Sequence, residues 1–465
     1  MEHHFKYSSL TQVIIYIKDI IKLCDGKLLS GDENIVINNI KIDSRKINDG
    51  DIYVGIRGEV NDGNIFFEDA INRGAKAIIV DNSKLDYDKY GDVTIVLVKD
   101  TVWCLQELAR YKRSLFKGEV IAITGSVGKT TTKDMVASIL GEKYKVLKTE
   151  GNYNNHIGLP LTILNYTLED VMVVELGMSH KGELSLLSRI AKPTLSIITN
   201  VGTAHIGNLG SRENILMAKL EILDGMDNKK LIINNDNDML HEYYVKNSDN
   251  VITVGINSSS MYRAVNVRDN CLFFDIDGYL ENVKNVYMNE AYIINLLVGY
   301  AVGSLLGLTN EEYLNGVKKV TLSSKRLEMV MNKYGYNIIN DSYNANYDSM
   351  KVGLEYLHNI NYSGRKIAVL ADMLELGEYS KKMHEDVGIE VVKNKIDVLV
   401  TVGEYARYIN DKAISVGFNK NNSYHFNSNI ECIDFLKGFL KRGDTVLFKG
   451  SNGMKLYEII DEIIK

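Results

Sequence analysis

The sequence predicts an α/β protein built from three domains. The chain has 465 residues, and a domain holds about 150 residues on average. From Glu119 onward, short apolar runs that end at polar or glycine residues alternate with helix-like stretches, a pattern typical of strands buried on both faces of a parallel sheet. The same alternation restarts after Thr321. We therefore expect domains at residues 1–117, 118–320 and 321–465.

The first domain has the pattern of a small α/β unit. The spacing of its apolar residues predicts helices at Leu10–Leu23 and Asp100–Phe116. Short apolar runs between these helices predict strands at Asp51–Ile56, Ala77–Val80 and Val93–Val98.

The second and third domains repeat the order strand, loop and helix. In the second domain, we expect strands at Val120–Ile123, Val171–Val174, Leu195–Thr199, Leu231–Ile233 and Val251–Val254, and a long helix at Asn289–Leu306. In the third domain, we expect strands at Asn337–Ile339, Ile367–Leu370, Val398–Val402 and Val446–Phe448.

Composition and charge exclude several classes of protein. Apolar residues make up 45% and charged residues 25%, which excludes a collagen-like or wholly disordered chain. The net charge of −6 argues against a nucleic-acid coat, so we expect no nucleic-acid partner. The chain holds only two prolines, which excludes proline-rich linkers.

Cysteine usage and hydropathy indicate the cytoplasm. The four cysteines lie far apart without a CxxC pair, which argues against a zinc ribbon or a disulfide framework. No stretch approaches about 18 uninterrupted apolar residues, so we expect no membrane span. The N-terminal residues MEHHFKY lack the basic and apolar regions of a signal peptide.

The strongest local motif is VIAITGSVGKTTTK, at residues 120–133. An apolar strand leads into a glycine-containing loop, then Lys129 and Thr130, then a helix. Backbone N–H groups and the helix N-terminus of such a loop bind phosphate, the lysine neutralises it, and the threonine hydroxyl joins a Mg²⁺ shell. The general GxxxxGK[ST] pattern is not met, because Ile123 occupies its first glycine position. The alternative is a Gly-Lys turn that only caps a structural helix.

Polar residues at strand ends give the next candidates. Glu175 ends the run VMVV, and His205 lies five residues beyond Asn200, which ends LSIIT. Ligands of doubly wound sheets bind beyond the carboxyl ends of the strands, so both side chains are placed to meet the phosphate loop. Spacing alone leaves a capping or loop-bonding role open for each. For Lys219, on a probable helix beside Glu221, composition alone favours a solvated surface residue.

The third domain offers two further candidates. Asp341 follows the strand NIIN and opens the polar cluster DSYNAN, which can be a turn without another role. Arg326 lies near the start of the domain. It can reach a nucleotide across an interdomain cleft or make a surface ion pair.

Together these segments resemble the Mur ligase family of ATP-dependent amide-forming enzymes. The resemblance spans nearly the whole chain and keeps the family's motif order. Its motifs are IDSRKINDGDIYVGIRGEVNDG, TGSVGKTTTK, GNYNNHIGLPLTIL, VELGMSHKGELSLLS, ITNVGTAHIGNLGSRENILMAKLEIL, INDSYNANYDSM, LADMLELGEYSKKMH and FKGSNGMKL. The resemblance implies a central P-loop ATPase sheet, a small N-terminal α/β domain and a Rossmann-like C-terminal domain.

The resemblance also implies roles for single residues. ATP phosphates would lie on the loop residues Gly125, Ser126, Val127, Gly128, Lys129, Thr130 and Thr131. Thr130 and Glu175 would bind one Mg²⁺, and His205 would help to hold a second. Lys219 matches a lysine that the family carbamylates, which contradicts the surface interpretation. Asn295 would lie beside adenine, and Arg326 and Asp341 around the ATP phosphates and ribose.

Substrates follow from the same resemblance. The third-domain motif is most similar to that of the members that add D-alanyl-D-alanine to UDP-N-acetylmuramoyl-tripeptide through an acyl phosphate, in peptidoglycan precursor synthesis. The UDP-sugar end would meet Ser44 and Arg45, and the region of Tyr343, Asn344 and Asn346 is our candidate for acceptor binding. We expect a monomer. Another Mur or folylpolyglutamate-type ligase and a non-catalytic ATP-binding regulator are the alternatives.

The chain departs from the family pattern at three positions. Ala291 stands where the family often has histidine, Tyr347 where it has proline, and Asn64 where it has histidine. None of these changes removes a residue on which the phosphate chemistry depends.

Overall fold

The computed structural model describes residues 14–37, 39–58, 60–330 and 332–465, and these residues fold around three β-sheets. The first sheet takes its strands from residues 27–97, the second from residues 119–284 and the third from residues 328–449. This arrangement confirms the predicted α/β class. The boundaries at residues 117/118 and 320/321 stay a prediction.

The first sheet has the order β1-β5-β4-β3-β2, and only β1 runs antiparallel to its neighbour. Its strands are β1 (Lys27–Ser30), β2 (Ile40–Lys41), β3 (Ile52–Val54), β4 (Ala77–Val80) and β5 (Thr94–Leu97), with helices α1 (Ile17–Cys24), α2 (Phe67–Asn72) and α3 (Thr101–Leu115). The helix predicted at Leu10–Leu23 is wrong at its start, because Tyr16 is extended and pairs with Val36. Residues 10–13 of that prediction lie outside the described residues.

The central sheet has nine strands in the order β14-β13-β12-β11-β10-β9-β6-β8-β7. They are β6 (Glu119–Thr124), β7 (Val146–Lys148), β8 (Val171–Glu175), β9 (Leu195–Ile198), β10 (Leu231–Asn234), β11 (Val251–Gly255), β12 (Tyr262–Arg268), β13 (Phe273–Ile276) and β14 (Leu280–Lys284). The helices are α4 (Lys129–Leu140), α5 (Gly158–Leu164), α6 (Glu183–Ala191), α7 (Ile206–Leu209), α8 (Arg212–Leu220), α9 (Asp238–Lys246), α10 (Glu290–Leu305) and α11 (Asn310–Lys318).

The third sheet has the order β15-β16-β20-β17-β18-β19. Its strands are β15 (Glu328–Val330), β16 (Asn337–Asn340), β17 (Lys366–Ala371), β18 (Val398–Val402), β19 (Ser423–Phe426) and β20 (Thr445–Lys449), and its helices are α12 (Tyr347–Asn359), α13 (Ser380–Lys393), α14 (Ala406–Ser415), α15 (Asn429–Phe439) and α16 (Leu456–Ile463). Short 3₁₀ turns occur at Ser44–Lys46, Gly63–Phe66, Asp88–Tyr90, Glu221–Leu223, Gly377–Tyr379, Lys420–Asn422 and Asn452–Met454.

All predicted strands are present, but the sequence analysis missed several others. It missed β1 and β2 of the first sheet, β7, β12, β13 and β14 of the central sheet, and β15 and β19 of the third. These strands are short or half-exposed, so they lack the continuous apolar run of a strand buried on both faces.

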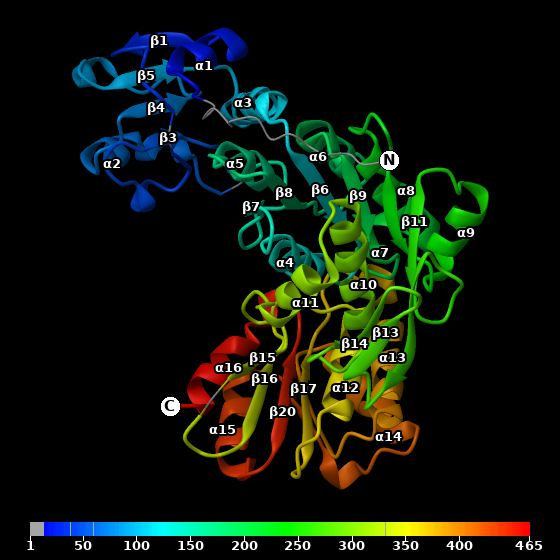
Figure 1. Ribbon diagram of the computed structural model, residues 1–465. Helices are drawn as coiled ribbons and strands as arrows, with labels where there is room; N and C mark the ends of the chain where they lie inside the picture. Colours follow the sequence, from blue (N-terminus) through cyan, green and yellow to red (C-terminus); the bar gives the residue numbers. More distant parts are fainter. Residues whose placement is uncertain (1–13, 38, 59, 331) are drawn as a thin grey trace.

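Topology brings the predicted site together. Strands β9, β6 and β8 are neighbours, so the segments after Ile198, Thr124 and Glu175 emerge side by side at one edge of the central sheet. In the third sheet the adjacent strands β16 and β20 end at Asn340 and Lys449. The third domain lies beside the central one, and the first domain lies at another end of the molecule (Figure 1).

Candidate active site

The phosphate loop is a tight turn between β6 and α4 that needs its two glycines. Gly125 has φ +154°, and a Cβ at this position would lie 1.9 Å from Thr199 Oγ1. Gly128 has φ +85°, in the left-handed region that favours glycine. The chain after β9 supports the turn, because Asn200 Oδ1 accepts hydrogen bonds from Ser126 N at 3.0 Å and Val127 N at 2.9 Å.

Lys129 is folded back over this loop. Its Nζ donates to the Gly125 carbonyl at 2.9 Å. Burial lowers the pKa of Lys129, while the nearby Glu175 carboxylate acts against that shift. The ammonium group therefore lies beside both the loop and the end of β8, as a lysine that neutralises bound phosphate must.

Thr130 and Glu175 supply oxygen atoms suited to magnesium. Glu175 Oε1 accepts a hydrogen bond from Asn154 Nδ2 at 2.8 Å. Glu175 Oε2 is buried and has no hydrogen-bond partner among the described residues, so it has a lone pair to offer. A hydroxyl and a carboxylate are the hard ligands that Mg²⁺ takes, with substrate phosphates and water completing its shell. The residues present therefore fit the ion.

His205 faces the third domain. Its Nδ1 lies 2.9 Å from Glu375 Oε2, but the two groups are not aligned for a hydrogen bond. Burial and the positive charge of Lys129 lower the pKa of His205, so the imidazole is favoured in its neutral form. A neutral imidazole can ligate a metal, although Mg²⁺ prefers oxygen.

Lys219 is buried on α8, so the surface interpretation from composition is wrong. Only 1% of the residue is exposed. Burial and the charge of Lys129 hold the pKa of Lys219 well below its ordinary value. Within the described parts of the chain, its amine makes no hydrogen bond or ion pair.

Asn295 lies on α10 next to the phosphate loop. Its Oδ1 accepts a hydrogen bond from Thr132 Oγ1 at 2.9 Å, and it lies 3.6 Å from the position of a Cβ on Gly128. The residue is therefore tied to the start of α4. Its contact with adenine stays a prediction.

Arg326 and its neighbours close the site from the third domain. Arg326 Nη2 donates to Thr130 Oγ1 at 3.2 Å, and its guanidinium lies 4.2 Å from the ring centre of Tyr343. Asp341 accepts a 2.6 Å hydrogen bond from Lys449, a buried lysine at the end of β20. The structure thus brings Arg326 to the phosphate loop and pairs Asp341 with a lysine that the sequence analysis gave no role.

A cavity of about 270 Å³ lies where the two domains meet. It is lined by Ser126, Lys129, Ala204, His205, Tyr343, Asn344, Ala345, Asn346, Leu374, Glu375, Leu376, Ser451, Asn452 and Gly453. Asn346 also caps α12, where Tyr347 takes the first helical position that proline often occupies. The candidate acceptor residues therefore face the phosphate loop across one cavity.

Ser44 and Arg45 lie apart from this cavity, in the first domain. Ser44 is buried, and exposed Arg45 pairs with Asp43 at 2.8 Å. Among the described residues, no hydrogen bond or ion pair of either residue reaches the central domain. Their contact with a UDP-sugar stays a prediction.

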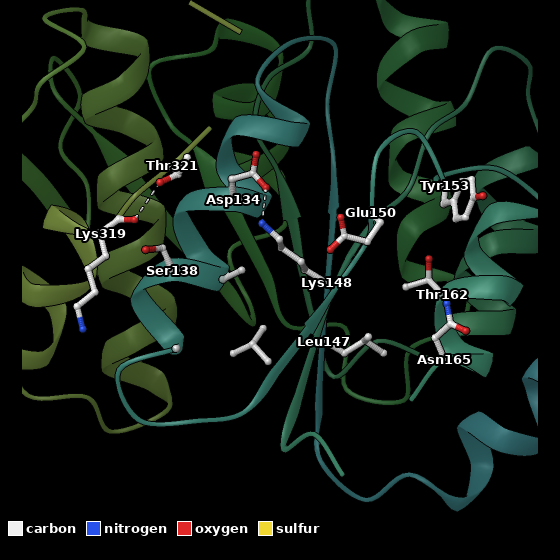
Figure 2. A pocket seen from close by; sticks show the side chains of 13 residues that line it. Asp134, Ser138, Leu147, Lys148, Glu150, Tyr153, Thr162, Asn165, Lys319 and Thr321 are labelled. Carbon is white, nitrogen blue, oxygen red and sulfur yellow. Dashed lines mark hydrogen bonds and ion pairs between the residues drawn. The ribbon is translucent and has the colours of Figure 1, made fainter. Parts of the chain in front are cut away.

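A larger cavity of about 630 Å³ follows the edge strand β7. Figure 2 shows Asp134 and Ser138 of α4 on one side of it, and Thr162 of α5 with Asn165, which follows that helix, on the other. None of the predicted site residues lines it.

Sequence reasoning missed three groups that organise the site. Asn154 binds Glu175, and Asp348 accepts from Thr203 N at 2.8 Å. The third group is Lys449, which binds Asp341. Asn154 and Asp348 lie inside recognised motifs, and Lys449 directly follows a predicted strand. These positions were a usable signal, but their partners depend on tertiary folding.

Fold and site define a class: an ATP-binding α/β enzyme of three domains, with a phosphate loop that the third domain contacts. Within the described residues, no helix is long and apolar enough to cross a membrane.

The chain belongs to the Mur ligase family. The Mur ligase middle domain matches residues 123–303, the Mur ligase glutamate ligase domain residues 325–452, and the Mur ligase family catalytic domain residues 36–113. The UDP-N-acetylmuramoyl-tripeptide–D-alanyl-D-alanine ligase of Bacillus subtilis is 35% identical over 97% of this chain and 98% of its own. The ligase of that name from Synechocystis is 34% identical over 96% of each chain.

Solved structures agree with this assignment. MurF from Acinetobacter baumannii superposes with a TM-score of 0.85 at 26% identity, covering 98% of this chain and 100% of that one. MurF ligase from Thermotoga maritima, in complex with ADP, has a TM-score of 0.78 at 29% identity, covering 92% and 97%.

Proposed function

We propose that this chain joins D-alanyl-D-alanine to UDP-N-acetylmuramoyl-tripeptide at the expense of ATP, a step of peptidoglycan precursor synthesis in the cytoplasm. The observation that carries the proposal is the cavity in which Lys129 and His205 face Tyr343 and Asn344. One wall belongs to the phosphate loop and the other to the third domain. Relatives that match almost the whole chain bear the name of this activity.

The chemistry begins at the terminal carboxylate of the tripeptide, which is a poor electrophile. An oxygen of this carboxylate attacks the γ-phosphorus of ATP, the bond to the β-phosphate oxygen breaks, and ADP leaves with both bonding electrons. Both reactants are anionic, so Lys129 and Arg326 reduce their repulsion. Bound Mg²⁺, held by Thr130 and Glu175 with His205 nearby, would supply further positive charge.

The second step forms the amide. The neutral amine of D-alanyl-D-alanine attacks the acyl carbon, phosphate leaves with the former carboxylate oxygen, and the attacking nitrogen releases one proton. Water would destroy the acyl phosphate, so the site has to be covered. Thr203 N and Oγ1 donate to Asp348 Oδ2 at 2.8 and 3.1 Å, which supports a covering role for the third domain.

We assign the remaining parts of the substrates by domain. Ser44 and Arg45 of residues 1–117 bind the UDP-sugar end, Asn295 and Asp341 bind the nucleoside of ATP, and the stretch of residues 343–346 binds the acceptor. The active species is a monomer. Light scattering during size-exclusion chromatography tests this by measuring the molar mass in solution.

Carbamylation of Lys219 completes the proposal. Burial holds the pKa of the Lys219 amine well below its ordinary value, which favours the neutral form, and a neutral amine attacks carbon dioxide. The resulting carbamate is an anion that can pair with Lys129. Carbon NMR after exchange with isotopically labelled bicarbonate should show one carbamate signal that is lost in Lys219→Ala. A wild-type spectrum without that signal would refute the modification.

An acceptor panel tests the function itself. ADP release is measured with UDP-N-acetylmuramoyl-tripeptides that end in lysine or in diaminopimelate, each offered D-alanyl-D-alanine, L-lysine, diaminopimelate or glutamate. We expect release to depend on D-alanyl-D-alanine alone. Release with glutamate would indicate a folylpolyglutamate-type ligase, and nucleotide binding without turnover would indicate a regulator.

A further inference from the structure

Arg326 lies in the linker of residues 319–327, which joins α11 to β15. The backbone of this linker has an unfavourable conformation next to Arg326. Lys325 and Leu327, on either side of Arg326, have φ of +60° and +46°. Residues other than glycine rarely adopt this left-handed region, and such strain persists where surrounding contacts fix the chain. The contacts of this linker therefore decide where the guanidinium lies.

On its C-terminal side the linker is fixed to its own domain. Lys325 N donates to Glu328 Oε2 at 2.8 Å, and the Lys325 carbonyl accepts from Tyr343 N at 3.3 Å. These bonds set the local shape of the chain. They cannot place it against the central domain, because both partners belong to the third domain.

Asp134 makes the matching contact on the N-terminal side. This residue of α4 is only 2% exposed, and its Oδ2 accepts from Ser323 N at 2.9 Å and from Ser323 Oγ at 2.7 Å. Its Oδ1 lies 3.2 Å from Lys148 Nζ, a contact visible in Figure 2, and 3.5 Å from Lys133 Nζ. The carboxylate thus binds a backbone and a side-chain donor of one linker residue.

The Asp134–Ser323 and Thr130–Arg326 contacts join the same face of α4 to the same short stretch of the linker. Thr130 and Asp134 are four residues apart on α4 and therefore share a helix face. Ser323 and Arg326 are three residues apart on the linker, and each meets one of the two helix residues. The linker is fastened to α4 at both points.

We propose that Asp134 and Ser323 are positioning residues that hold the linker against α4, so that Arg326 reaches the phosphate end of the nucleotide site. The inference rests on the proposed function for the role of Arg326. Asp134 and Ser323 touch no reacting atom themselves.

The charge environment suits this role. Burial acts to raise the pKa of Asp134, but Lys133, Ser323 and Lys148 outweigh it and hold the pKa below its ordinary value. The group is therefore a carboxylate, the stronger acceptor for Ser323. Lys133 in turn donates to the Thr149 carbonyl at 2.8 Å, and Thr149 Oγ1 accepts from Glu175 N at 3.0 Å, so Asp134 is linked to the end of β8.

A double-mutant cycle tests the proposal on the full chain. Affinity for a non-hydrolysable ATP analogue with Mg²⁺ is measured by calorimetry for wild type, Ser323→Ala, Arg326→Gln and the double variant. Loss of a hydrogen bond to a buried carboxylate predicts that Ser323→Ala weakens binding by about three- to ten-fold. In the Arg326→Gln background it should change binding by less than about two-fold, because the group it positions is gone.

Ser138→Ala is the matched control. Ser138 lies one turn beyond Asp134 on α4, and its Oγ donates to the Gly316 carbonyl at 2.9 Å, away from the linker. It should leave nucleotide affinity unchanged. The proposal would be overturned if Ser323→Ala lowered nucleotide affinity equally with Arg326 and with Gln at position 326. It would also be overturned if Ser138→Ala lowered nucleotide affinity as much as Ser323→Ala does.

Asp134→Asn tests the charge of the anchor in the same assay, and its melting temperature reports whether the variant folds. If Asp134→Asn does not fold, the double-mutant cycle of Ser323 and Arg326 still tests the proposal. The assay needs no acceptor, so its outcome is separate from that of the proposed function. If ADP release did not depend on D-alanyl-D-alanine, the proposed function would be refuted, but the measurement of nucleotide affinity would still test the positioning role.

Discussion

At the scale of single residues, two lysines dominate the candidate site, the half-buried Lys129 and the fully buried Lys219. Burial, together with the charge of Lys129, lowers the pKa of Lys219, so the amine of Lys219 is favoured in its neutral form. Sequence patterns located Lys129 from its loop alone. They gave no such signal for Lys219, because a helical lysine beside a glutamate looks solvent-exposed until the fold is known.

Lys129→Ala should abolish most of the ligase activity. The variant loses a fixed positive group beside the transferred phosphate, which is worth roughly 2.7–4 kcal/mol of transition-state stabilisation. The measurement is ADP release at saturating substrates. Lys420→Ala, which removes an exposed lysine of the third domain, is the control and should match wild type. Near-normal ADP release by Lys129→Ala would refute the phosphate assignment.

His384 should make stability depend on pH. It is buried, accepts from Met373 N at 3.0 Å and contacts the Ser380 carbonyl, so it fixes the loop that carries Glu375. Burial lowers its pKa in the folded state. The unfolded chain therefore binds a proton first, and stability is lost as pH falls below about 6.5.

Urea unfolding from about pH 7.5 to about pH 5.5 measures this loss. We expect a flatter profile for His384→Gln, whose amide can accept from Met373 but does not titrate. His180→Gln, at an exposed histidine, should keep the wild-type slope. Parallel slopes for wild type and His384→Gln would contradict the assignment.

At the scale of elements, the phosphate loop shows what tertiary structure adds to a motif. Gly125 and Gly128 are where the sequence placed them, and β6 and α4 follow the predicted order. The support from Asn200 could not be predicted, because a strand-end asparagine has no pattern that names its partner. Asp134 likewise directly follows a recognised motif, yet its bond to Ser323 spans 189 residues of sequence.

Gly125→Ala should cost nucleotide binding more than stability. The added Cβ would lie 1.9 Å from Thr199 Oγ1, so the loop must move away from β9. Calorimetric affinity for the ATP analogue measures the effect. Gly417→Ala has the same kind of positive φ, +108°, but open space around it, so it should lower the melting temperature without changing affinity. Equal affinities for wild type and Gly125→Ala would refute this account of the loop.

At the scale of the whole molecule, the site is assembled from two sheets whose carboxyl ends meet. The positions of the strands buried on both faces were predictable from short apolar runs. The contacts between domains were not: the bonds from Arg326 to Thr130 and from Thr203 to Asp348 join residues that no local pattern pairs. Those contacts bring the phosphate loop and the residues of the third domain into one site.

The most direct test follows the oxygen atoms of the donor. The donor is UDP-N-acetylmuramoyl-tripeptide with a heavy oxygen isotope in both positions of its terminal carboxylate. It is incubated with ATP, Mg²⁺ and D-alanyl-D-alanine, and the masses of the products are measured by mass spectrometry. The account predicts the pentapeptide product with one heavy oxygen in its new amide and the other in inorganic phosphate. Unlabelled phosphate, or phosphate release without a joined product, would contradict it.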